Sequence, residues 1–572
     1  MSDEMSDEMK AASGPSFPDD FNLADYFLFD RLAEGLAESP AILFGGRSYT
    51  YGEVAEKTRE LRAFFAKAGI RREERVLIVL HDVPAFVWAF FATLHHGAVV
   101  AMANPEAPAE DLAYLVEYTR ATAMVTIPRV AASIANAIAA SDLRTVVLAP
   151  EIATGEEIER DPAFEPSLEP LGAIGLAAAL ARGREAQGDT SLVPRKTKRD
   201  DVAIWLFTSG STGRSKAALH GHGDFAFNTE VYAKRTIGYR RGDITVSVPR
   251  LFFGYATGTN LMFPFAVGAT TALYAERPTP ENLVAAIERH KPTIVTNVPT
   301  MMSKLLDHDD IRRERGDTVL DLSSVRLSLS AGEALAEPLY QRFRKRFGGD
   351  VFDGIGSAEM FHIYCSNRPG DVRPGTLGRV VEGYEIRLLP IDAIGPGAVE
   401  VAQGETGMMW VRGPSASMGY FEDRQKSFDT FFGAWCRTGD LFRADASDAY
   451  EFLGRADDLL KVSGIWVAPV EVEECLSSHR AVSLAAVIGA EEDKLVKVKA
   501  FIVLREDMTT TDPVALQALA EELREHVKSR LSKHKYPRSI VFCEDVPKND
   551  RGKVDKKTLR EREARGENPK GV

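Results

Sequence analysis

Short apolar strands and amphipathic helices alternate along the first part of this 572-residue chain. The strands are predicted at 76–80, 99–102 and 123–127, and the helices beside them at 53–68, 84–95 and 111–118. Parallel strands need crossover connections of this kind, which are usually helices. The alternation therefore predicts an α/β fold built on parallel sheets.

The same rhythm resumes after residue 200, with strands predicted at 202–207, 244–248, 293–296, 325–330 and 350–352 and helices starting near 223 and 280. Residues 150–198 have weak periodicity and are interpreted as a loose connector. From 376 to 454, short strands separated by Gly and Pro predict a β-rich subdomain. A compact α+β unit follows, with a helix from Asp512 to near Tyr536.

Three divisions of the chain follow from these patterns. Residues 1–18 repeat the acidic stretch Met-Ser-Asp-Glu and are expected to form a disordered tail. Residues 19–456 are expected to form a large N-terminal domain of parallel α/β sheets with the β-rich subdomain. Residues 457–572 are expected to form a small C-terminal α+β domain.

Charge and apolar content narrow the classes of partner. Seventy Lys and Arg residues against 83 Asp and Glu residues give a net charge of −13, which argues against binding to nucleic acid or to anionic membranes. The longest apolar run, near Phe86–Ala92, is too short to span a bilayer. The four cysteines are far apart and lack metal-ligand spacing. Free thiols and the absence of a leader pattern predict a cytoplasmic protein.

One stretch combines an apolar strand with a loop suited to phosphate. Residues Ile204–Lys216 read Ile-Trp-Leu-Phe-Thr-Ser-Gly-Ser-Thr-Gly-Arg-Ser-Lys. Glycines let backbone N–H groups turn toward an anion, hydroxyls add donors and the lysine adds charge. The spacing does not fit the Walker pattern, and an isolated loop of this kind also fits an ordinary turn. The candidate phosphate-binding residues are Thr208, Ser209, Gly210, Ser211, Thr212, Gly213 and Lys216.

Five later motifs occur together with this loop. They are Ser330–Glu333 (SAGE), Asp353–Glu359 (DGIGSAE), Trp435–Asp440 (WCRTGD), Gly454–Gly464 (GRADDLLKVSG) and Pro547–Lys553 (PKNDRGK). In order and spacing they resemble the core motifs of the adenylate-forming (ANL) superfamily, which includes acyl- and aryl-CoA ligases, peptide-synthetase adenylation domains and luciferases. The resemblance extends from about residue 20 to the end of the chain.

The resemblance implies roles for individual residues in ATP binding. Glu359 is similar to the family's Mg²⁺ ligand, an oxygen donor of the kind that this ion prefers. Asp440 resembles the carboxylate that binds the ribose hydroxyls, and Arg455 would add a ribose or phosphate contact. Gly332, Glu333 and Asp353 correspond to residues at the nucleotide, although strand-to-turn geometry also accounts for the first two.

The family alternates between two half-reactions by moving its C-terminal domain, and the resemblance extends to that mechanism. Lys553 resembles the lysine that bridges the carboxylate and the α-phosphate during adenylation. Asp457 resembles the hinge about which the small domain swings. Lys461 and Gly464 lie on the loop that would then face the active site, where glycine leaves room for the pantetheine of coenzyme A.

Four stretches look specifically like benzoate-type aryl-CoA ligases: Leu251–Tyr255, Asp353–Ile363, Val372–Gly378 and Lys461–Glu473. Motif position implies an acyl pocket lined by Val231, Tyr232, Phe252, Phe253, Ala331, Gly356, Phe361 and His362. Aromatic walls with small residues at the base suit a flat ring. His362 either forms a hydrogen bond with a ring substituent or packs at the ring edge.

The sequence therefore predicts ATP-dependent activation of benzoate, 2-aminobenzoate or a related acid through an aryl-adenylate, followed by transfer to coenzyme A. ATP, Mg²⁺ and coenzyme A are the expected small molecules. Two alternatives stay open: loading of an aryl acid onto a carrier protein, and a non-catalytic nucleotide-binding scaffold. The sequence also leaves the oligomeric state open, including a homodimer.

Overall fold

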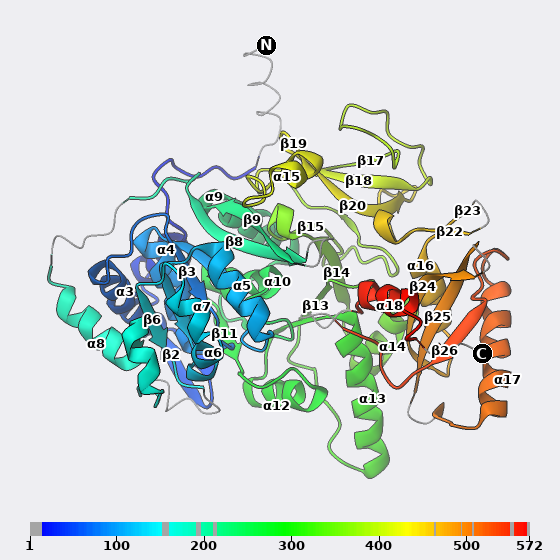
Figure 1. The fold of residues 1–572 in the computed structure, drawn as a ribbon, viewed down its shortest axis with the longest axis horizontal. Helices are drawn as coiled ribbons and strands as arrows, with labels where there is room; N and C mark the ends of the chain where they lie inside the picture. Colours follow the sequence, from blue (N-terminus) through cyan, green and yellow to red (C-terminus); the bar gives the residue numbers. More distant parts are fainter. Residues whose placement is uncertain are drawn as a thin grey trace.

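The computed structural model describes residues 14–151, 160–189, 196–209, 214–462, 465–492, 495–505, 508–548 and 554–568. Figure 1 shows a broad N-terminal region of sheets and helices, with a smaller C-terminal unit at one end. The predicted α/β class, with parallel sheets, a β-rich part and a smaller C-terminal domain, is confirmed.

The first sheet contains seven strands in the described part of the chain, in the order β7-β6-β5-β3-β4-β8-β9. Their bounds are β3 Arg75–Ile78, β4 Val99–Met102, β5 Ala123–Thr126, β6 Thr145–Leu148, β7 Ala173–Gly175, β8 Val202–Ser209 and β9 Ser215–Gly221. Neighbours run parallel except β8 and β9, which form an antiparallel hairpin at one edge. Strands β4, β5 and β6 are buried along their whole length, as expected for parallel strands covered on both faces.

The helices of the N-terminal region connect and cover the strands (Figure 1). In chain order they are η1 Asp25–Phe29, α2 Asp30–Ala33, α3 Tyr51–Lys67, α4 Pro84–His96, α5 Ala109–Thr119, α6 Pro128–Ser133, α7 Ala135–Ala139, η2 Pro166–Leu171, α8 Leu176–Ala186, α9 His222–Asn228, η4 Thr229–Ile237, α10 Gly254–Thr257, η5 Gly258–Met262, α11 Phe263–Ala266, α12 Pro280–His290, α13 Pro299–Arg315, α14 Glu337–Phe347, η6 Ala358–Met360, α15 Arg424–Thr430 and η7 Ala456–Asp458.

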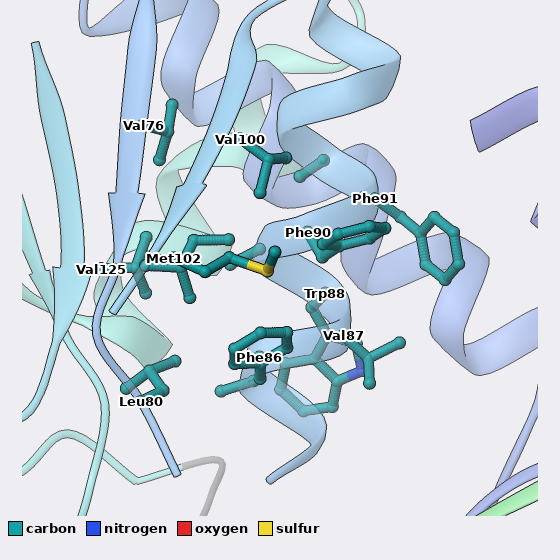
Figure 2. Close-up of a cluster of buried hydrophobic side chains, with 14 of the residues drawn as sticks. Val76, Leu80, Phe86, Val87, Trp88, Phe90, Phe91, Val100, Met102 and Val125 are labelled. Carbon is teal, nitrogen blue, oxygen red and sulfur yellow. The ribbon is translucent and has the colours of Figure 1, made fainter. Parts of the chain in front are cut away.

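Helix α4 packs in the core because nearly all of its side chains are apolar. Trp88 and Phe90 are fully buried, and Met102 of β4 points toward the helix in Figure 2. Burying one such side chain contributes about 1.5–3 kcal/mol. Pro84 opens the helix, where its missing N–H is not needed, and Gly97 ends it with φ +78°.

The second sheet contains nine strands among the described residues, in the order β16-β15-β14-β13-β12-β10-β11-β1-β2. Their bounds are β1 Pro40–Phe44, β2 Arg47–Thr50, β10 Ile244–Ser247, β11 Thr270–Leu273, β12 Ile294–Asn297, β13 Leu327–Ala331, β14 Val351–Gly356, β15 Ile363–Ser366 and β16 Arg379–Val380. Strands β13 and β14 run parallel, with Ala331 opposite Gly354. Their carboxyl ends therefore bring Glu333 and Glu359 to the same edge of the sheet, where ligands bind in parallel α/β folds.

The β-rich part is an antiparallel sheet of five strands in the described residues. It consists of β17 Glu385–Leu389, β18 Gly407–Arg412, β19 Phe431–Phe432, β20 Trp435–Ala444 and β21 Tyr450–Arg455. Strands β20 and β21 pair so that Asp440 stands opposite Arg455. The pairing brings together two predicted site residues from different motifs.

The interpretation of 150–198 as a loose connector is wrong for most of its described part. Strand β7 extends the first sheet, and α8 packs along α3. The two helices approach so closely that a Cβ on Gly183 would lie 1.8 Å from the Glu60 carbonyl oxygen. Glycine at this position therefore permits the contact. Small residues at this contact weaken the apolar periodicity that the sequence prediction relied on.

The C-terminal unit joins a β-ribbon to a small mixed sheet. Its elements are β22 Leu460–Val462, β23 Ile465–Val467, α16 Pro469–Ser477, β24 Val482–Glu492, β25 Leu495–Leu504, α17 Pro513–Lys528, β26 Ser539–Phe542 and α18 Lys556–Ala564. Asp512 caps α17 as predicted, by accepting from the Val514 N–H at 3.1 Å. The helix ends at Lys528 rather than near Tyr536, so its predicted length is wrong. Arg505 contacts Asp307 of α13 at 3.5 Å and links this unit to the N-terminal region.

The beginning of the described chain is packed rather than free. Residues 1–13 of the predicted tail lie outside the described residues, whereas the Phe17 ring lies 5.0 Å from that of Phe21. Arg199 donates to the Phe17 carbonyl at 2.9 Å. Within the described ranges, none of the helices combines the length and the apolar character required to cross a bilayer.

Candidate functional site

The predicted phosphate loop belongs to the stretch of chain that joins β8 to β9, two antiparallel strands. Thr208 pairs with Lys216 across the two strands. Gly210, Ser211, Thr212 and Gly213 lie outside the described residues, as does the Ser209 side chain. Lys216 is largely buried and forms an ion pair with Asp423, whose pKa is lowered mainly by the hydrogen bond from this lysine. The lysine therefore lies at the base of the loop with a carboxylate beside it.

Asp423 has a second contact that fixes its position. It caps α15 by accepting from the Lys426 N–H at 3.1 Å. The sequence prediction missed this carboxylate because more than 200 positions separate it from Lys216, and no local pattern links them.

Glu359 lies in the short helix η6, just beyond the carboxyl end of β14. The Tyr420 hydroxyl donates to its Oε1 at 2.6 Å, and the Ser417 N–H donates to its backbone carbonyl at 2.8 Å. Burial and the adjacent carboxylate both raise the pKa of Tyr420, so this phenol stays protonated and donates. No hydrogen bond from the described residues reaches the second oxygen, Oε2. Tyr420 was also missed from the sequence, for the same reason as Asp423.

Asp440 and Arg455 form the pair expected at the ribose. Arg455 Nη1 lies 3.0 Å from Asp440 Oδ1, and its Nη2 lies 3.7 Å from Asp457. Burial disfavours the charged guanidinium, but the carboxylates outweigh burial and raise the pKa of Arg455. Arg455 thus joins the predicted ribose carboxylate to the predicted hinge residue.

Gly332 and Glu333 follow β13. Gly332 has φ +90°, a conformation that favours glycine. Glu333 Oε2 accepts from the Thr300 N–H at 2.9 Å and from the Thr300 hydroxyl at 2.7 Å. The Glu333 side chain therefore holds the start of α13, where negative charge is favourable.

Asp353 is buried in β14, beside Ser330 of β13. Burial raises its pKa to about 8. Its Oδ1 is buried and has no hydrogen-bond partner within the described ranges. Because a buried polar atom is normally paired, this oxygen is a candidate to contact a bound ligand.

His362 lies in a group of aromatic rings at the predicted acyl pocket. Its ring centroid lies 4.7 Å from that of Phe263, 5.4 Å from Tyr255 and 5.6 Å from Tyr232. Burial lowers the pKa of His362 to about 4, so the ring is neutral near pH 7. Nε2 faces the Tyr255 carbonyl at 3.0 Å and therefore carries the proton. Nδ1 is a buried acceptor with no partner in the described part of the chain.

The other predicted pocket residues differ in how deeply they are buried. Val231 and Tyr232 are buried in η4, and Ala331 is buried at the end of β13. A Cβ on Gly356 would lie 2.4 Å from the His362 carbonyl oxygen, so glycine permits the close approach. Phe252 and Phe253 are half-buried, with ring centroids 4.5 Å apart. Tyr255 and Phe263, absent from the predicted pocket, contact the His362 ring directly.

Three predicted site residues come from the C-terminal part of the chain: Lys461, Gly464 and Lys553. Lys461 is exposed in β22, opposite Trp466 of β23. Gly464 and Lys553 lie outside the described residues. Their roles in the two half-reactions remain predictions.

Two family models match the chain. The AMP-binding enzyme model covers residues 29–421, and the AMP-binding enzyme C-terminal domain model covers residues 471–553. The chain belongs to the AMP-binding enzyme family. This membership confirms the resemblance drawn from the ordered motifs.

Individual relatives of this family cover nearly the whole chain. A benzoate–CoA ligase of Thauera aromatica is 37% identical over 95% of this chain and 96% of its own length. A 4-hydroxybenzoate–CoA/benzoate–CoA ligase of Rhodopseudomonas palustris is 37% identical over 95% of this chain and 94% of its own length. The crystal structure of an anthranilate CoA ligase in complex with anthranoyl-AMP superposes with a TM-score of 0.84 at 31% identity, covering 95% of this chain and 98% of that one.

Proposed function

We propose that this protein activates an aromatic carboxylate with ATP and transfers the acyl group to coenzyme A. In the first step a carboxylate oxygen attacks the α-phosphorus, giving an aryl-adenylate and pyrophosphate. In the second, the thiol of coenzyme A attacks the acyl carbon, giving aryl-CoA and AMP. Family membership and the relatives that act on benzoate and anthranilate support this assignment.

The observation that carries the aromatic assignment is the neutral His362 within its group of aromatic rings. Flat walls favour a planar substrate through offset and edge contacts. The unpaired Nδ1 accepts a hydrogen bond, so an amino or hydroxyl group on the ring would satisfy it. Benzoate, hydroxybenzoates and 2-aminobenzoate are therefore the proposed substrates.

The nucleotide side is proposed to work by positioning and charge. Lys216 would interact with the ATP phosphates, either in place of its ion pair with Asp423 or while keeping it. Asp440, held by Arg455, would accept from the ribose hydroxyls. Asp353 Oδ1 would accept a hydrogen bond from a donor on the nucleotide base.

The residues present also fit a magnesium ion. Glu359 offers Oε2, a hard oxygen that accepts no hydrogen bond from the described residues, while Tyr420 donates to the other oxygen. A bound Mg²⁺ would neutralise charge on the ATP phosphates. In this proposal Glu359 would hold the Mg²⁺, and Tyr420 keeps the Glu359 carboxylate in place. Lys553 would bridge the reacting carboxylate and the α-phosphate.

The domain boundary at Asp457 remains part of the proposal. It is supported by the end of β21 at Arg455 and by the separate sheet formed by β24, β25 and β26. Arg455 contacts both Asp440 and Asp457, so the hinge begins next to the ribose site.

Pyrophosphate release with a panel of carboxylates tests the proposal. Benzoate, aminobenzoates and hydroxybenzoates should release pyrophosphate faster than short fatty acids do, and aryl-CoA should form when free coenzyme A is added. Faster turnover of fatty acids would remove the aromatic assignment. Aryl transfer only to a phosphopantetheinyl protein would favour the carrier-loading alternative, and no carboxylate-dependent release would favour a non-catalytic scaffold.

A Lys553→Ala variant separates the half-reactions. It should lower adenylation by orders of magnitude, because a transition-state contact is lost. Thioester formation from supplied aryl-adenylate should be largely retained. Equal loss in both steps contradicts the role given to Lys553.

A further inference from the structure

The chain between Glu359 and His362 contains a backbone conformation that residues other than glycine seldom adopt. Phe361 has φ +68° and ψ −58°. The His362 N–H donates to the Met360 carbonyl at 2.9 Å. Together these values describe a γ-turn with a positive central φ, which is rare and strained. Such a turn persists only where its surroundings fix it.

The surrounding elements donate hydrogen bonds to the three carbonyls that precede the strained residue and to the Ile363 carbonyl after it. The contacts are His220 Nε2 to Ala358 O at 2.6 Å, Ser417 N to Glu359 O at 2.8 Å, Ser415 Oγ to Met360 O at 2.8 Å and Asn228 Nδ2 to Ile363 O at 2.8 Å. Three of these donors are side chains, from β9, from α9 and from the loop after β18. Hydrogen bonds therefore fix the backbone on both sides of the strained turn.

Tyr384 connects two of these side-chain donors, Ser415 and Asn228. Its hydroxyl lies 2.6 Å from Ser415 Oγ and accepts from Asn228 Nδ2 at 3.0 Å. Ser415 uses its single proton on the Met360 carbonyl, so it must accept from Tyr384. Asn228 has two amide protons, one for Tyr384 and one for Ile363.

The direction of every hydrogen bond in this network is thereby fixed. Asn228 donates to Tyr384, Tyr384 to Ser415, and Ser415 to the Met360 carbonyl. All three side chains are buried. Burial raises the pKa of Tyr384, so the phenol keeps the proton that it must donate.

We infer that Tyr384, acting through Asn228 and Ser415, is a positioning residue for acid activation. The turn that it supports separates Glu359, on the nucleotide side, from His362, on the acyl side. A fixed turn keeps these two groups at a constant separation, as attack of a carboxylate on a phosphorus requires. The inference rests on the proposed function and adds the residues that align its two substrates.

Tyr384→Phe tests the inference because it removes one hydroxyl and keeps the ring, which packs against Phe227. Ser415 and Asn228 then lose their shared partner. The kcat for pyrophosphate release should fall about tenfold or more, with a raised KM for the aryl acid. Discrimination between benzoate and 2-aminobenzoate should also weaken. Ser415→Ala should reproduce this pattern, and the double variant should add little because the residues act as a unit.

Tyr51→Phe is the matched control. Tyr51 is also buried, and its hydroxyl donates to the Ala269 carbonyl at 2.6 Å rather than to a predicted site residue. This variant should lose thermal stability while its kcat and KM per folded molecule stay unchanged.

Three outcomes decide whether Tyr384 positions the two substrates. Tyr384→Phe and Ser415→Ala proteins that fold and match Tyr51→Phe in both kinetic parameters overturn the positioning role alone. If Tyr384→Phe does not fold, Ser415→Ala decides, since it leaves the aromatic packing intact. Wild-type protein that releases no pyrophosphate with any carboxylate contradicts the proposed function, and the positioning role with it.

Discussion

Removal of the Tyr420 hydroxyl is the sharpest test of how the nucleotide side is built. Tyr420 donates to Glu359 Oε1 at 2.6 Å, and its side chain is buried against Phe431. Tyr420→Phe keeps this packing and deletes only the donor. A hydrogen bond to a charged group is worth about 1.5–3 kcal/mol. If the hydrogen bond stabilises the transition state by that amount, its loss lowers kcat/KM for acid activation by about 10- to 150-fold.

Magnesium titration separates this effect from a general loss of folding. Glu359 without its hydrogen bond is free to turn away, so the variant should need more Mg²⁺ to reach half of its maximal rate. The assay is carboxylate-dependent ATP–pyrophosphate exchange at several Mg²⁺ concentrations, with Tyr51→Phe as the control for loss of a buried hydroxyl. Unchanged kcat/KM together with an unchanged Mg²⁺ response would refute the orientation of Glu359 by Tyr420.

Three further substitutions test other contacts. His362→Phe should lower the ratio of kcat/KM for 2-aminobenzoate over benzoate by about 2- to 10-fold, because Nδ1 is lost as an acceptor; an unchanged ratio means that His362 only packs. Glu333→Ala should destabilise α13 by about 1 kcal/mol and lower the thermal midpoint, since the cap on Thr300 is removed; an unchanged midpoint contradicts the capping role. Burial raises the pKa of Asp353 from 3.8 to about 8, so the folded protein keeps a proton that the unfolded chain releases near pH 4. Its stability relative to Asp353→Asn should therefore fall as the pH rises from about 4 to about 8, measured by thermal midpoints; a constant difference contradicts the shift.

Local patterns were enough to predict the parallel sheets and the apolar helix α4. Their signals are apolar runs, helical spacing and Gly or Pro at element ends, all of which lie within a few residues. Helix α8 escaped prediction because its contact with α3 depends on Gly183, where the absence of a side chain matters more than apolar character. The end of α17 was placed too late because apolar spacing continued to Leu531, although the helix stops at Lys528.

The site was predictable where a motif is continuous in sequence. Asp440 and Arg455 were each assigned from their own motif, and the β20–β21 register then placed them opposite each other. Tyr420 and Asp423 were missed because their partners lie 61 and 207 positions away. Such pairs depend on how distant elements pack, which spacing along the chain does not encode.

The path of one oxygen atom tests the central claim most directly. Benzoate labelled with ¹⁸O in its carboxylate is incubated with ATP, coenzyme A and the protein, and the AMP is analysed by mass spectrometry. Attack of the carboxylate on the α-phosphorus predicts one ¹⁸O in each AMP formed, with aryl-CoA as the other product. Label-free AMP, or label found in inorganic phosphate instead, would contradict activation through an aryl-adenylate.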